Sequence, residues 1–180
     1  MRIALLLAFI RLVDRISAAA AAAAIVFLAA MAAIMLAEIF VRYFFNSTLH
    51  FSWEFASYLM SSVFFLGSAY TLRTSGHIRM SIVSETVPER VRLALDIVCT
   101  LIGVAITSLI AAALVDLAWQ SYLRGVTSAT PTETLLAIPQ AGPALGACLL
   151  CLQMVARLAC LLIGRAPDLA PPGGDLEIEM

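Results

Sequence analysis

Few side chains in this sequence are of the types that carry chemistry, and the first to consider are its four cysteines. Cys148 and Cys151 form a Cys-x-x-Cys pair, a spacing that redox pairs and metal ligands share. The pair lies inside an apolar stretch, with no acid or histidine beside it that would activate a thiol. We therefore interpret these two cysteines as small buried thiols that pack between helices.

The two histidines, His50 and His77, fall in different loops, which we expect on opposite sides of a membrane. Ligation of a haem by two histidines, or a shared metal site, would need the two rings close together. No serine has a base near it in sequence, and no glycine-rich phosphate loop is present. The sequence therefore predicts no enzyme activity, no cofactor and no metal.

The composition shows which elements could position any functional residue. Of the 180 residues, 62% are hydrophobic and only 13% are charged, whereas a soluble domain is about half apolar and about a quarter charged. A chain this short cannot hide such a surplus in a core, because small globules expose much of their surface. A net charge of −1 also gives no sign of the basic patch that a nucleic-acid-binding protein needs. A soluble single domain and a nucleic-acid partner are therefore excluded.

Four stretches without charge explain the surplus, namely residues 16–37, 55–72, 97–115 and 134–156. As helices they reach roughly 27 to 35 Å, which matches a hydrocarbon core of about 30 Å. We predict an all-α integral membrane protein in which one domain, residues 1–166, has four transmembrane helices. The expected bounds are about 16–44, 52–73, 88–118 and 138–164.

Both ends of the chain receive separate interpretations. Residues 1–15 contain arginines and an aspartate between apolar residues, which predicts a short amphipathic helix on the membrane surface. A cleaved signal peptide is the alternative, but the apolar run that continues to Ala37 is too long for one. Residues 167–180 are rich in proline, glycine and acids, and we expect a disordered cytoplasmic tail.

The arginines predict the orientation. Nine of them fall in the N-terminal arm, the loop after the second helix and the C-terminal segment, whereas only Arg42 and Arg124 fall in the two opposite loops. By the positive-inside rule both termini are cytoplasmic.

The loop after the first helix contains the most informative polar residues. Glu38 and Arg42 are four residues apart on one helical face, where they can pair. Ser52 is a candidate N-cap for the second helix, with Glu54 in its first turn. One interpretation is that Arg42 and the surrounding aromatic residues only anchor helix ends. The other is that Arg42 and Glu54 lock the first two helices at a surface that another protein uses.

Small residues suggest how the helices pack. Gly142 and Gly146 are four apart in the fourth helix, and Ser57 and Ser61 have the same spacing in the second, a pattern that permits close approach. Pro139 fits the first turn of the fourth helix. Carriers usually keep ionisable residues near the bilayer centre, where they bind the cargo. The four apolar stretches of this chain have no charged residue at that depth. These features predict an accessory or scaffold subunit of a membrane complex.

Four motifs then point to a family. RYFFN (residues 42–46), FSWE (51–54), FFLGSAYTLRTSGHIRM (64–80) and LAIPQAGPALG (136–146) occur in this order. Together they resemble the small permease subunit of tripartite ATP-independent periplasmic (TRAP) transporters, the DctQ-like component, over roughly residues 39–152. The chain departs from the family pattern at Phe55, where a second acid is common, and near Ser81, where an acid often follows the His-Ile pair.

The resemblance implies a fixed scaffold in the bacterial inner membrane that binds a large permease subunit. A periplasmic substrate-binding protein would deliver an organic acid such as a C4-dicarboxylate, and an ion gradient would drive uptake. The loop 120–134 would face that protein, and no substrate or ion ligand is expected in this chain. The residues that the resemblance implies at partner surfaces are Arg42, Asn46, Trp53 and Glu54 on the periplasmic side, Arg73 and His77 on the cytoplasmic side, and Pro139, Pro143 and Gly146 at the start of the fourth helix.

A small redox membrane protein, either a quinone-linked thiol oxidase or a haem-binding four-helix subunit, is the alternative hypothesis. The thiol enzyme would need its Cys-x-x-Cys pair in an outer loop, and here the pair lies within a predicted helix.

Overall fold

The computed structural model describes residues 2–74, 89–130 and 132–162, and in these ranges the protein is built from helices. All four are long and apolar enough to cross a membrane, which confirms the prediction of four spans. They are α1 (Arg2–Phe45), α2 (Ser52–Arg73), α4 (Glu89–Arg124) and α5 (Ala137–Leu162). His77 and the tail 167–180 lie outside the described residues.

Two helices are longer than expected. α1 runs without a break from Arg2 to Phe45, so the prediction of a separate helix over residues 1–15 is wrong. The physical reason is that no proline or glycine interrupts this stretch, and Val13 and Ser17 are buried within the fold. α4 continues to Arg124 instead of ending near residue 118.

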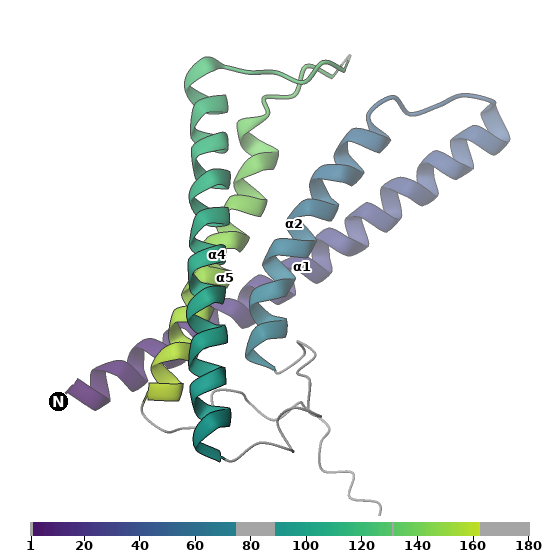
Figure 1. Ribbon diagram of the computed structural model, residues 1–180. Coiled ribbons are helices and arrows are strands. Elements are labelled where there is room, and N and C mark those ends of the chain that lie inside the picture. The colour runs from purple at the N-terminus through teal and green to yellow at the C-terminus, as the bar shows by residue number, and fades with distance from the viewer. Residues whose placement is uncertain (1, 75–88, 131, 163–180) are drawn as a thin grey trace, which may run out of the picture.

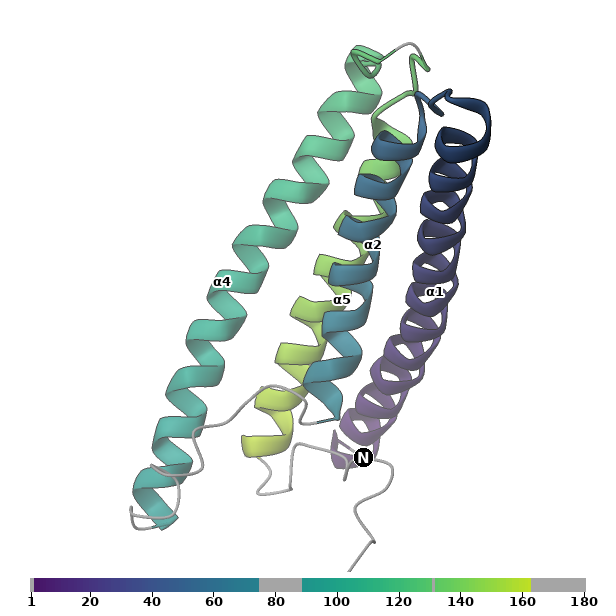
Figure 2. The ribbon, with the colours of Figure 1, turned by 90° about the vertical axis from the view of Figure 1, so that its right-hand side faces the viewer.

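The helices form a row in the order α1, α2, α5, α4. α1 packs on α2, α2 on α5, and α5 on α4, with a smaller contact between α1 and α5. Figure 2 shows α4 and α1 at the two sides, with α2 and α5 between them. Figure 1 shows that the α1–α2 pair and the α4–α5 pair diverge toward the end where each pair is connected. α5 is therefore the central helix, and α4 packs chiefly on α5.

Glycines allow α5 to approach α2 closely. A Cβ atom on Gly146 would lie 2.6 Å from the carbonyl carbon of Phe65, and one on Gly142 would lie 2.2 Å from the Oγ of Ser62. The close-packing role that we expected for these glycines is confirmed. The matching expectation for α2 is wrong, because Ser57 and Ser61 are exposed and the serine that faces α5 is Ser62.

Much of the apolar surface stays exposed in this chain. On α4, for example, Leu109 is 72% and Leu123 is 65% exposed. The cysteines do not all pack inside, since Cys148 and Cys99 are exposed, Cys151 is half-buried and Cys160 is buried. The interpretation of Cys148 as a buried thiol is therefore wrong, because its side chain borders an open recess between α4 and α5 and is not enclosed by the two helices. Exposed apolar surface of this extent is typical of contact with lipid or a partner.

Candidate functional site

The connection between α1 and α2 is organised by one buried carboxylate. Glu38, only 4% exposed, accepts hydrogen bonds from the Leu49 backbone N–H at 2.7 Å and from the Ser52 hydroxyl at 3.1 Å. Its other oxygen accepts a 2.7 Å bond from the Arg42 guanidinium, which confirms the predicted pair. Asn46 ends the helix with a φ of 47°, a conformation in which asparagine is enriched. Glu38 therefore ties the end of α1 to the start of α2.

Two sequence interpretations of this region need correction. Ser52 does not cap α2, because the N-cap residue is Phe51 and no side chain makes a capping hydrogen bond at that position. Ser52 follows the N-cap as the first residue of α2, and its hydroxyl donates a hydrogen bond to Glu38 instead. Arg42 and Glu54 do not lock the first two helices together, because Glu38 fills that role and Glu54 bonds elsewhere.

Arg42 lines an open groove at this end of α1. The side chain is 57% exposed while that of Glu38 is only 6% exposed, so the pair presents its positive member outward. The groove has a volume of about 660 Å³. Its lining residues are Met35, Glu38, Ile39, Arg42, Tyr43, Asn46 and Trp53. The structure therefore brings the predicted residues Arg42, Asn46 and Trp53 together.

Glu54 serves a different contact. It accepts hydrogen bonds from the Tyr58 hydroxyl at 2.8 Å, from Thr132 at 2.6 Å and from Thr130. The two threonines belong to the connection between α4 and α5, which Figure 1 shows reaching across toward the start of α2. Sequence reasoning singled out Glu54 but missed this partner, because more than 70 residues separate the two segments.

The connection between α4 and α5 has internal order of its own. Backbone bonds from Ser128 to Thr134 and from Leu136 to Val126 close it at 2.9 and 3.0 Å. Gly125 turns the chain directly after α4 and has a φ of 60°. Glycine is favoured at this position because the backbone there is in the left-handed conformation. Together with Glu54, these contacts hold a loop rich in serine and threonine in one position over the start of α2.

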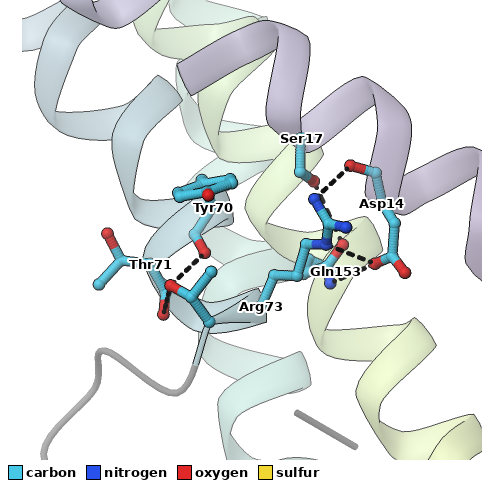
Figure 3. Close-up of polar contacts among 7 residues, drawn as sticks. Asp14, Ser17, Tyr70, Thr71, Arg73 and Gln153 are labelled. Atoms are coloured by element: carbon cyan, nitrogen blue, oxygen red, sulfur yellow. Dashed lines mark hydrogen bonds and ion pairs between the residues drawn. The ribbon is translucent and has the colours of Figure 1, made fainter. Parts of the chain in front are cut away.

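A second polar network joins three helices at the opposite end of the molecule (Figure 3). Arg73 of α2 pairs with Asp14 of α1, with 3.4 Å between Nε and Oδ1, and donates to the Asp14 backbone carbonyl at 3.1 Å. The Gln153 amide of α5 donates to Asp14 at 3.2 Å and accepts a 3.2 Å bond from Ser17. The Arg73 guanidinium also lies 5.9 Å from the centre of the Tyr70 ring.

Sequence reasoning selected Arg73 but missed Asp14, Ser17 and Gln153. A signal existed, since Gln153 is the one strongly polar side chain among residues 141–156. Buried amides in membrane helices commonly bond to a neighbouring helix. The remaining predicted residues lie at the α2–α5 contact or beside it. Pro139 falls in the first turn of α5, as expected, and lines a small apolar cavity, whereas Pro143 and Gly146 are buried.

The polar groups of the described spans therefore hold helices together. Each carboxylate discussed above is bonded within the chain, and these clusters do not converge on one cavity. In the parts of the chain that the structure covers, no three histidine, cysteine, aspartate or glutamate side chains are placed to hold a metal ion. The polar contacts described above join helices and connections of this chain to one another.

Comparison with known proteins agrees with this architecture. A family model described as "Tripartite ATP-independent periplasmic transporters, DctQ component" matches residues 31–164, well over half of the chain. Searches of curated proteins and of solved structures gave no match. The matched range contains α2, α4 and α5 and the groove around Arg42. The chain therefore belongs to the DctQ family, the small membrane components of TRAP transporters.

Proposed function

We propose that this chain is the scaffold subunit that pairs with a large permease subunit and works with a periplasmic substrate-binding protein. The complex takes up an organic acid, such as a C4-dicarboxylate, and an ion gradient drives the uptake in the bacterial inner membrane. The observation that carries the proposal is the use of polar groups: within the described spans, Glu38, Glu54 and Asp14 all bond to other parts of the same chain.

The exposed apolar surface of α4 is consistent with contact to a partner subunit. α4 packs chiefly on α5 and leaves large side chains such as Leu109, Trp119 and Leu123 exposed. Helices in lipid gain little from burying apolar surface as such, so partners associate through shape and polar contacts. A four-helix row with two free sides offers such surfaces to a larger subunit.

The orientation that we propose places both termini in the cytoplasm. The start of α1, the end of α2, the start of α4 and the end of α5 share one end of the molecule (Figure 2). Seven arginines of the described helices lie toward that end, which favours the cytoplasm; they are Arg2, Arg11, Arg15, Arg73, Arg90, Arg92 and Arg157. The opposite end, with the connection held by Glu54, then faces the periplasm and the substrate-binding protein.

The predicted partner residues divide into two groups on this proposal. Arg42, Asn46 and Trp53 lie on the surface and can contact a partner directly. Glu54, Arg73, Pro139, Pro143 and Gly146 act indirectly, because they fix the helices that present this surface. The role of His77 stays a prediction.

Capture of the partner tests the proposal. The tagged chain, purified in mild detergent from its own membranes, should bring a large permease subunit with it. Deletion of its gene should abolish uptake of the organic acid that the substrate-binding protein binds. Recovery of no large subunit, or unchanged uptake in the deletion strain, would refute the proposal. The DctQ family comprises transporter components and not enzymes, which argues against the redox alternative.

A further inference from the structure

Beside Arg42 lies an open groove that combines a charged side chain with apolar walls, formed by Met35, Ile39, Arg42, Tyr43, Asn46 and Trp53 over Glu38. We call it the Arg42 groove. It lies where α1 and α2 connect, at the end of the helices that carries the aromatic residues. Its lower wall consists of Met35 and Ile39, and its rim carries Tyr43, Asn46 and Trp53. It is therefore apolar toward the middle of the helices and polar at its mouth.

The charge in this groove is positive toward its opening. Glu38 is buried, and two of its three hydrogen bonds are directed to Leu49 and Ser52, away from Arg42. A guanidinium has five N–H donors, and one bond, to Glu38, is the contact found for Arg42 in the described residues. Glu38 thus holds the guanidinium in place while the Arg42 side chain stays 57% exposed and most of its donors are left for a partner. A planar fork of this kind matches a carboxylate with two parallel bonds.

The side chains around the guanidinium are of the types that dominate protein interfaces. Tyr43 is 79% and Trp53 is 68% exposed in this chain, and both border Arg42. Arginine, tryptophan and tyrosine are enriched in the residues that carry most of the binding energy at interfaces. The groove also continues into an exposed apolar face of α1 that includes Leu36 and Phe40. A helical partner could therefore cover the groove and this face together.

We infer that the Arg42 groove receives an acidic side chain of the large permease subunit, with Tyr43 and Trp53 packing beside it. The inference rests on the proposed function, because it assigns the surface at which that partner docks. A lipid phosphate shares the charge that Arg42 would bind. The protein carboxylate fits better, because the groove combines a pre-oriented arginine with two exposed aromatic side chains and a neighbouring helix face.

The experiment uses the whole complex, with both membrane subunits co-produced and the small subunit tagged. Arg42→Glu should lower the amount of large subunit recovered by at least about tenfold, because a like charge would face the partner's carboxylate. Arg42→Gln should lower it less, and Arg42→Lys least. Arg124→Glu is the matched control, since Arg124 is also exposed and lies at the same end of the molecule, on α4. It should leave recovery within about twofold of the wild type.

A second variant separates docking from folding. Ser52→Ala removes a hydrogen bond to Glu38 but replaces no residue that lines the groove, so recovery should stay within about twofold of the wild type. If Ser52→Ala loses the large subunit as completely as Arg42→Glu, the groove acts through the fold and the inference is wrong.

The remaining outcomes are distinct. Equal recovery with wild type, Arg42→Glu and Arg42→Gln would overturn the inference and leave the proposed function standing. No large subunit with the wild type would overturn the proposed function itself. Full recovery accompanied by loss of phospholipid phosphorus from the purified Arg42→Glu complex would show that the groove binds lipid, and would likewise overturn the inference.

Discussion

The contact between α2 and α5 makes a sharp prediction about Gly146. A Cβ atom there would lie 2.6 Å from the Phe65 carbonyl carbon and 2.7 Å from the Leu66 amide nitrogen, both of them backbone atoms that cannot rotate away. Gly146→Ala must therefore push the two helices apart. Overpacking of this kind costs about 1–3 kcal/mol of unfolding free energy.

Gly146→Ala also has a stabilising effect on the helix, and a control variant measures this effect separately. Alanine stabilises a helix interior by roughly 0.5–1 kcal/mol relative to glycine. Gly67 lies inside α2, and a Cβ atom added to it would meet no heavy atom within 4 Å, so Gly67→Ala should show the gain alone. The difference between the two variants then reports the steric cost, and we expect Gly146→Ala to be less stable than Gly67→Ala by about 1–3 kcal/mol.

The assay is the loss of helical circular dichroism as SDS is added to the protein in mild detergent. Gly142→Ala provides an internal scale, because the atom it approaches most closely is the Ser62 hydroxyl at 2.2 Å, which can rotate. Its stability should lie between those of the other two variants. Equal stability of Gly146→Ala and Gly67→Ala would refute the reasoning, since it would mean that the helices do not meet closely at Gly146.

Three further predictions concern the polar contacts and the cysteines. Asp14→Asn should destabilise the protein by about 1–2 kcal/mol in the same assay, because it leaves Arg73 without its carboxylate; a stability equal to wild type would contradict a structural role for the pair. Glu54→Ala should speed hydrogen exchange in the connection between α4 and α5 by about tenfold, because two threonine hydroxyls lose their acceptor; unchanged exchange there, measured by mass spectrometry against the centre of α5 as reference, would show that Glu54 does not hold the loop. In mild detergent, Cys148 should react with a maleimide faster than Cys160, because only the former is exposed; the reverse order, read by peptide mapping, would place α5 in a different rotation.

The central position of α5 gives these contacts a common meaning. α5 meets α2 through glycines, meets α1 through Gln153, and carries α4 on another side. Substitutions that disrupt the packing of α5 should therefore weaken the contacts among all four helices. Substitutions that disrupt α4 should leave the contact between α1 and α2 intact.

Helix number and span could be predicted from the sequence because they depend on local properties. A membrane-crossing helix needs about 20 apolar residues in a row, and the uncharged blocks of this chain show such runs directly. The Glu38–Arg42 pair was predictable for a similar reason, since residues four apart on a helix are neighbours. The family resemblance also followed from short motifs, and it includes RYFFN, which contributes Arg42 and Asn46 to the groove.

Other features were not predictable, because they join residues far apart in the chain. Ser17 and Gln153 are separated by 136 positions and Glu54 and Thr132 by 78, so no local pattern links them. The continuation of α1 through residue 15 was missed because charges among apolar residues suit either a surface helix or a helix that packs on its neighbours.

The amino-acid sequence alone is therefore enough to establish that the chain crosses the membrane four times and which transporter family it belongs to. The folded structure was needed to show which faces meet, that Glu38 rather than Glu54 joins α1 to α2, and that Arg42 faces an open groove. This division arises because lipid is as apolar as leucine, so hydrophobicity does not specify a packing face inside a membrane. Close glycine contacts and hydrogen bonds between distant residues specify it instead, and these exist only once the helices are in place.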